Sequence, residues 1–221
     1  MMDRNLGATS ATPGDVGALG LLYQWGRKDP FLGSSSISSR TVAKSTITWP
    51  SAVYSTSSTG DIAYATANPT TFIKRNNFNK DWYWHTGADI RWTSSEKTKS
   101  IYDPCPAGWR VPDGGDNGVW AKALGSRSSF KRKSLYNKSK KGMNFSGKFG
   151  ESSIIWYPAS GFRYGDIGKL NNVDFGGYYW SASSSSKGAN DMSFEYDGDV
   201  QPSFYSPCAF GKSVRCVKYK N

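Results

Sequence analysis

The segment 176–219 constrains the fold most, because apolar residues frame a long polar interior within it. One end carries Tyr178-Tyr179-Trp180, and at the other end residues 213–217 alternate small apolar with polar side chains. These patterns predict a buried strand and a half-buried strand. The interior is rich in Ser, Gly, Asp, Tyr and Phe. A polar and aromatic interior between two strands indicates a displayed surface.

The composition of the 221-residue chain favours short strands and ordered turns over packed helices. Aromatic residues make up 15% of it, Leu and Ile are sparse, and there are 24 glycines. The length suffices for a substantial core, and the aromatic content excludes a disordered chain. We expect most of the nine Trp residues, Trp25 among them, to pack in that core.

The net charge of +11 is concentrated in a basic insert, residues 126–150. No acidic residue occurs in 117–150, and aromatic residues are interleaved with the basic ones. Such a segment is typical of a solvated loop or hairpin, and residues 126–148 are also a candidate contact for anionic polymers. We do not expect nucleic acid as the partner. The basic residues are Arg127, Lys131, Arg132, Lys133, Lys138, Lys140, Lys141 and Lys148.

Several function classes are disfavoured by what the chain lacks. His85 is the one histidine, which leaves little material for His-based catalysis or zinc sites. No apolar run is long enough to cross a membrane, and Met1 leads directly into polar residues without a signal peptide. We therefore expect no membrane span, and either an excised segment of a longer protein or an intracellular chain.

The acidic segment 113–118 has spacing similar to a calcium loop, but the downstream bidentate Glu is missing. A turn that leads into a helix fits better, with Asp116 or Asn117 as the cap and Gly125 as the stop. Val119, Trp120, Ala123 and Leu124 would form its buried face. We expect neither a metal ion nor a cofactor in this protein.

A second short helix is predicted after Asp61, which can cap it. Ile62 and Ala65 give this helix one apolar side, and Pro69 forces its end.

Four blocks of sequence resemble the Fibrobacter succinogenes major paralogous domain family, found on cell-surface proteins of Bacteroidetes. They are DRNLGA with LYQWGRKDPF, IAYATANPTTFI with DWY, YDPCPAGWRVP, and GYYWSAS with GKSVRCVK. The resemblance implies an α+β, C-type lectin-like fold with two short helices, small twisted antiparallel sheets and long ordered loops. It implies one such domain over residues 1–221. The expected location is the cell surface, the extracellular space or a phage particle, with any upstream targeting segment absent from this chain.

Closely similar domains are the variable proteins of diversity-generating retroelements in Bacteroides and its phages. In those proteins a C-terminal segment between YYW-type and SVR-type strands is mutagenised at adenines, and its side chains bind the ligand. Residues 183–212 are drawn largely from the amino acids that mutated Asn codons yield. The resemblance therefore implies a non-enzymatic adhesin-type or receptor-binding protein whose variable region is 178–212. The alternative within the family is an ordinary surface or lipoprotein domain without diversification.

The expected partner is a surface protein or a glycan, bound by outward-facing side chains of this region. Tyr, Ser, Gly and Asp are also what antibody paratopes use. Alternation along the segment would turn Met192, Phe194 and Val200 toward the core. The candidate ligand-binding residues are Ser184, Ser186, Asp191, Glu195, Tyr196, Asp197, Asp199, Gln201, Ser203, Tyr205, Ser206, Cys208, Phe210 and Lys212.

The resemblance also implies a disulfide between Cys105 and Cys216, which lie in two of the matched blocks. It leaves Cys208 as a reduced thiol or as the partner of a second molecule. Formylglycine-generating enzymes share the lectin-like fold class and use a thiolate pair near the C-terminus, a role that Cys208 and Cys216 could fill. Their spacing differs from that of the enzymes and no catalytic set accompanies them, so we expect no catalytic residues.

Overall fold

A computed structural model describes most of the chain and shows a mainly β protein with two short helices among the described residues. The helices are α1 (Ile62–Ala67) and α2 (Val119–Leu124), and the 3-10 helices η1 (Val16–Ala18) and η2 (Lys133–Leu135) add single turns. The prediction of an α+β protein with two short helices is confirmed for the described residues, whereas the expectation of only small antiparallel sheets is wrong, because one sheet has nine strands and another is a parallel pair. The described residues are 1–41, 51–75, 80–85, 91–92, 99–125, 128–146, 155–185 and 188–218.

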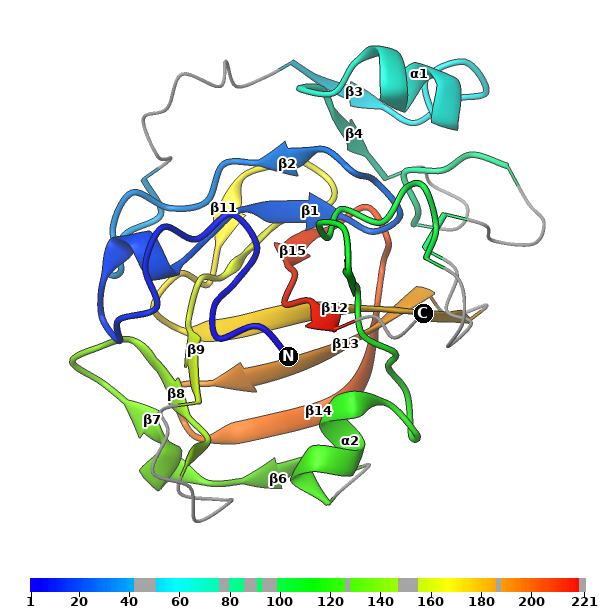
Figure 1. Ribbon diagram of the computed structural model, residues 1–221. Coiled ribbons are helices and arrows are strands. Elements are labelled where there is room, and N and C mark those ends of the chain that lie inside the picture. The colour runs from blue at the N-terminus through cyan, green and yellow to red at the C-terminus, as the bar shows by residue number, and fades with distance from the viewer. Residues whose placement is uncertain are drawn as a thin grey trace.

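The largest sheet has nine strands in the described part of the chain, and three long antiparallel strands dominate it (Figure 1). These are β12 (Gly176–Ser185), β13 (Gly188–Glu195) and β14 (Asp199–Ser206). The strand order is β11-β10-β15-β12-β13-β14-β6, and β1 joins at β15 and carries β2. The short strands are β1 (Leu22–Gln24), β2 (Pro30–Phe31), β6 (Phe130–Lys131), β10 (Phe162–Arg163), β11 (Leu170–Asn171) and β15 (Gly211–Ser213).

Three smaller sheets surround this one. The parallel pair β3 and β4 lies beside α1 at one end of the molecule, and α2 lies near β14 and β6 toward the other end (Figure 1). A second pair, β5 and β16, joins the middle of the chain to its C-terminal segment. The bounds are β3 (Ala52–Tyr54), β4 (Phe72–Lys74), β5 (Trp109–Arg110), β7 (Tyr136–Asn137), β8 (Gly142–Asn144), β9 (Trp156–Pro158) and β16 (Val217–Lys218), where β7, β8 and β9 form the third sheet.

Helix α1 begins as predicted, because the Asp61 side chain accepts a hydrogen bond from the Tyr64 amide at 2.6 Å. Helix α2 ends as predicted at Gly125, which adopts the left-handed conformation with φ 65°. The predicted cap of α2 by Asp116 or Asn117 is wrong. Gly118 occupies the N-cap without a side-chain hydrogen bond. A β-carbon there would lie 2.5 Å from Gly114, so the close approach of two backbones excludes a capping side chain.

Helix α2 covers one face of the long strands, where the two elements bury apolar side chains against each other. Met192, Phe194 and Val200 are buried there, as predicted, together with Trp120 and Leu124 of the helix. Ala121 replaces the predicted Ala123 in the buried face of α2, because Ala123 is exposed.

Trp side chains link β1 to β12 across the intervening strand β15. The Trp25 indole N–H donates to the Ser181 carbonyl at 2.7 Å, and that of Trp180 donates to the Tyr23 carbonyl at 2.9 Å. Both rings are fully buried, which confirms the core position predicted for Trp25. A buried indole needs a hydrogen-bond partner, and backbone carbonyls supply it here.

The strand predicted over residues 213–217 is wrong in two respects. The segment splits between β15 and β16, and it is buried from Ser213 to Cys216 rather than half-buried. Three strands, β1, β10 and β12, pair with β15. The N-terminal segment covers the rest, with the Leu6 amide donating to the Val214 carbonyl at 2.8 Å.

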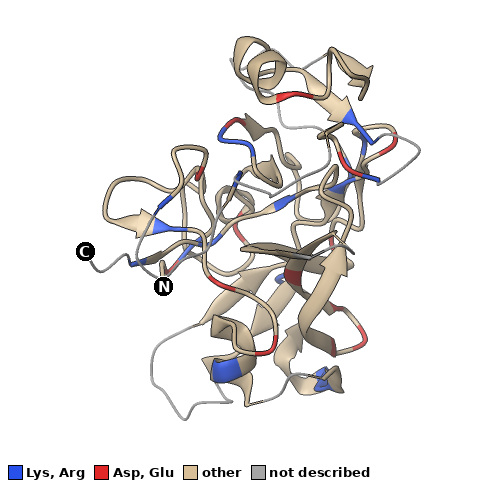
Figure 2. Ribbon diagram, turned by 90° about the vertical axis from the view of Figure 1, so that its right-hand side faces the viewer, with Lys and Arg blue, Asp and Glu red and all other residues tan. Residues whose placement is uncertain are grey.

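The described part of the basic insert, residues 128–146, forms an edge strand and a hairpin rather than a stacking platform, and Arg127 and Lys148 lie outside the described residues. Strand β6 pairs with β14, and β7 turns into β8. Tyr136 and Phe145 belong to the core cluster under α2, so these interleaved aromatics serve packing. Lys138 and Lys140 are exposed on the turn. Figure 2 shows the Lys and Arg positions distributed over separate parts of the chain. None of the helices in the described ranges is long and apolar enough to cross a membrane.

Cys105 and Cys216 form the disulfide that the resemblance implied. The loop before Cys105 is held from inside by Asp103, whose carboxylate accepts from the amides of Cys105 and Val111, both at 2.8 Å. Burial raises the pKa of Asp103 despite these bonds. The cross-link therefore joins a tightly hydrogen-bonded loop to the segment between β15 and β16.

We predict that the disulfide contributes about 2–5 kcal/mol to the free energy of unfolding, since it closes a loop of 111 residues. A reductant should lower the stability of the wild-type protein by this amount in denaturant titrations. The matched control is the Cys105→Ala, Cys216→Ala double variant, which should be less stable from the start and insensitive to the reductant. Equal stability of this variant and the oxidised wild type would contradict the prediction.

Candidate ligand-binding cavity

A cavity of about 260 Å³ lies on the face of the main sheet opposite α2. Strand β13 alternates across the sheet, so Asp191, Ser193 and Glu195 lie on this face while Met192 and Phe194 lie under the helix. Six of the fourteen predicted binding residues line the cavity. They are Asp191, Glu195, Gln201, Ser206, Phe210 and Lys212.

A buried ion pair between Asp191 and Lys212 forms part of the cavity wall. Their side chains are 0% and 3% exposed, and the Lys212 ammonium donates to the Asp191 carboxylate and, at 2.6 Å, to Ser206 Oγ. Burial raises the pKa of Asp191 and lowers that of Lys212, while the partner charge opposes each shift. The Lys212 ammonium also lies 4.5 Å from the Trp180 ring centroid, a cation–π contact.

Aromatic rings from three strands and a loop form another side of the cavity. Phe162 stacks on Phe210 with centroids 5.4 Å apart and contacts Tyr178 edge to face at 4.9 Å. Phe204 stands at the cavity with 49% of its surface exposed. Phe162, Tyr178 and Phe210 pack against one another, so they present a preformed apolar surface next to polar groups.

The polar groups of the cavity are mainly hydrogen-bond acceptors. The Tyr178 hydroxyl accepts from Asn172 at 2.8 Å and donates to the Glu195 carboxylate at 3.3 Å. Partial burial raises the pKa of Glu195, and the nearby Asp197 and Asp199 carboxylates raise it further. The Gln201 amide nitrogen donates to Asp199 at 3.3 Å, which leaves its carbonyl oxygen as an acceptor.

The remaining predicted residues lie outside the cavity. Tyr196 and Tyr205 are exposed at 49% and 41%, and Ser184 is exposed too. Asp197 forms an ion pair with Lys131 at 2.8 Å.

Ser203 accepts a hydrogen bond from Asn190 at 3.1 Å, on the α2 side of the sheet. Asp199 is half-buried, Cys208 is buried, and Ser186 lies outside the described residues.

The outward orientation predicted for Asp191, Ser206, Cys208 and Lys212 is wrong, because all four are buried. Asp191, Ser206 and Lys212 satisfy one another by hydrogen bonds, which allows polar groups to lie inside. Cys208 packs in the apolar cluster that contains Trp25. Its carbonyl accepts from the Trp25 amide at 3.2 Å.

Sequence reasoning missed five residues of the cavity: Phe162, Asn172, Tyr178, Ser193 and Phe204. Ser193 could have been found, since it lies between Asp191 and Glu195 in the period of two. Phe204 could not, because the β13–β14 pairing shifts register between Asp191 and Ser193. This irregularity brings both Gln201 and Phe204 to the cavity, although simple alternation would separate them.

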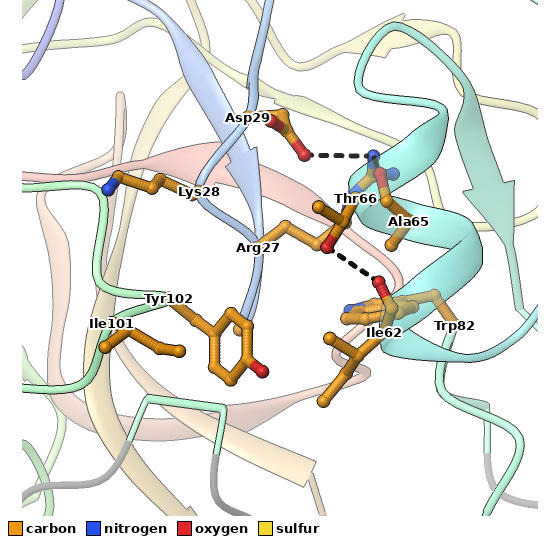
Figure 3. A pocket seen from close by; sticks show the side chains of 10 residues that line it. Arg27, Lys28, Asp29, Ile62, Ala65, Thr66, Trp82, Ile101 and Tyr102 are labelled. Atoms are coloured by element: carbon orange, nitrogen blue, oxygen red, sulfur yellow. Dashed lines mark hydrogen bonds and ion pairs between the residues drawn. The ribbon is translucent and has the colours of Figure 1, made fainter.

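A second cavity, of about 200 Å³, lies between α1 and the turn after β1 (Figure 3). Its Arg27 is buried and donates to the Thr71 carbonyl at 2.7 Å, to Gln24 at 3.0 Å and to Asp29 at 3.3 Å. Desolvation lowers the pKa of Arg27 and raises that of Asp29. Arg27 also donates to the Ala65 carbonyl of α1 at 3.3 Å and to the Asn68 carbonyl just after the helix at 3.2 Å, so we assign Arg27 to holding α1 against the sheet.

Among the residues that the structure describes, no cluster of His, Cys, Asp and Glu side chains could hold a metal ion. No protein-family model matched the chain, and comparisons with curated proteins and with solved structures found no significant match.

We predict that Lys212→Met destabilises the fold by about 3–5 kcal/mol, because it leaves the Asp191 carboxylate buried without its cation. The double variant Asp191→Asn, Lys212→Met should recover most of this loss in chemical denaturation. Lys131→Met is the matched control, since it breaks an exposed ion pair and should lower the stability far less. Equal effects of the two single Lys variants would contradict the prediction.

We predict that Glu195→Gln stabilises the protein at neutral pH. The raised pKa means that the folded chain holds the Glu195 proton more tightly than the unfolded chain, whose ordinary value is 4.5. The contribution of Glu195 to stability is therefore greatest below that value and falls as the pH rises through the folded pKa. Unfolding curves of the two proteins should converge in acid and separate toward neutral pH. A lower stability of the variant at neutral pH would contradict the assignment.

Proposed function

We propose that this protein is a non-enzymatic, C-type lectin-like binding domain whose ligand enters the cavity on the main sheet. The main support is that residues 178–212 contain both core residues and cavity-lining residues. Met192, Phe194 and Val200 supply core, whereas their neighbours Ser193 and Glu195 line a cavity with a preformed aromatic side. A rigid frame with adaptable polar groups and aromatic anchors is the chemistry of recognition.

We further propose that the chain is the variable protein of a diversity-generating retroelement, carried by a Bacteroides-type bacterium or a phage, and that it acts as an adhesin or receptor-binding protein at a cell or particle surface. The sequence blocks and the composition of residues 183–212 support this. So does the position of the segment on the sheet, where side chains that line the cavity alternate with side chains of the core. A surface or lipoprotein domain without diversification is the alternative.

The formylglycine-generating type of oxidoreductase is less well supported. Its thiolate pair would have to be Cys208 and Cys216, but Cys216 is bonded to Cys105. With Cys216 held in the disulfide, the two thiolates that this chemistry uses are not both present.

We predict that sibling sequences vary at Ser193, Glu195, Gln201 and Phe204 and keep Met192 and Phe194. Changes at the first group alter only the cavity, whereas truncating a buried Met or Phe costs about 2–5 kcal/mol. The measurement is the sequence of the gene's neighbourhood and of its siblings. It should reveal a near-identical repeat that differs at adenines beside a reverse transcriptase.

Differences spread evenly over the chain, with no such repeat, would refute the retroelement proposal and leave the non-diversified surface domain. The core positions serve as the internal control, because they lie in the same segment and differ only in the face of the sheet that they occupy.

A further inference from the structure

We propose that the cavity selects a cationic side chain, Lys or Arg, on a protein partner. This inference rests on the proposed binding function and names the ligand chemistry of the same site.

The charge around the cavity is opposite to that of the whole chain. The protein carries +11, yet residues 188–206 contain four carboxylates and no Lys or Arg. Asp191 is neutralised by Lys212 and Asp197 by Lys131. No ion pair involves Glu195 or Asp199 within the described ranges. Glu195 lines the cavity and Asp199 lies beside it, hydrogen-bonded to the wall residue Gln201, so the two carboxylates give this region a negative charge. A local negative site in a basic protein attracts cations and repels anionic groups.

The hydrogen-bonding groups match an ammonium or guanidinium ion. Ser193 is 6% exposed and lines the cavity, and its hydroxyl makes no hydrogen bond within the described part of the chain. It lies opposite Gln201 and Tyr178 on the neighbouring strands. Ser193 Oγ, the Glu195 carboxylate and the Gln201 carbonyl oxygen are three acceptors, and a Lys ammonium carries three donors and no acceptor.

The walls favour a cation as well. Aromatic faces attract cations, and this protein already holds the Lys212 ammonium at 4.5 Å from Trp180 and 5.5 Å from Tyr178. Lys212 does not cancel the attraction, because its charge is balanced by Asp191 inside the wall. A volume of about 260 Å³ is below the usual range for drug-sized ligands and suits one long side chain.

The test is a titration of the full chain, followed by its backbone amide NMR resonances, with three probes. These are Nα-acetyl-lysine methylamide, the uncharged Nα-acetyl-norleucine methylamide and a methyl hexopyranoside. We expect the lysine probe to shift the amides of Ser193, Glu195 and Phe204 in a saturable way. The norleucine probe should bind at least about tenfold more weakly, which corresponds to about 1.4 kcal/mol.

Two variants localise the effect. Glu195→Gln should weaken binding of the lysine probe by about tenfold, and Ser193→Ala should weaken it by a smaller factor. Asp116→Asn removes an equal charge from an exposed loop on the α2 side of the sheet and should change nothing. Amide shifts away from the cavity must stay unchanged in each variant, which shows that it folds.

Equal binding of the norleucine and lysine probes, or undiminished binding by Glu195→Gln, would overturn the proposal. Binding of the hexopyranoside without the lysine probe would identify a glycan site instead, and that outcome would preserve the proposed binding function. If no probe shifts the cavity amides, the cation proposal fails. The retroelement proposal would still be decided separately by the gene's neighbourhood.

Discussion

The central constraint of this structure is that strands β13 and β14 have two faces of opposite chemistry. Met192, Phe194 and Val200 need an apolar cover, which α2 and the aromatic residues of the β7–β9 sheet provide. Asp191 and Glu195 on the other face cannot be covered by an apolar layer, because buried carboxylates need partners. The fold meets this demand with Lys212 for Asp191 and with a polar cavity in front of Glu195.

The Asp191–Lys212 pair has a consequence that extends beyond its own strands. It joins β13 to β15 across β12, and β15 is the strand on which β1 and β10 also pair. A buried ion pair gives little net stability after desolvation, yet its two charges become costly when separated. The pair therefore favours one arrangement of the sheet. It also neutralises the positive charge of Lys212 at the cavity wall.

The period of two in the sequence was sufficient to predict that Met192, Phe194 and Val200 face the core, and it identified six residues of the cavity. It did not predict how deeply Asp191 is buried, because alternation assigns Asp191 to a face of the sheet but does not reveal that Lys212 approaches from another strand. It failed also for Phe162 and Asn172, which precede the segment and reach the cavity through the pairing of β10 with β15 and of β11 with β10. Long-range pairing and strand irregularities leave no local signal in the sequence.

These two faces limit how far the segment can change while the fold persists. A substitution at Ser193, Glu195 or Gln201 alters the cavity and touches little of the apolar cluster. Truncation of a neighbouring core residue, Met192, Phe194 or Val200, would instead open a void under α2. Asp191 and Lys212 lie between these cases, because neither can change alone without stranding a buried charge. Such a segment tolerates variation only at the positions that line the cavity. The core positions that alternate with them are fixed by packing, so part of the rigid scaffold lies within the binding region itself.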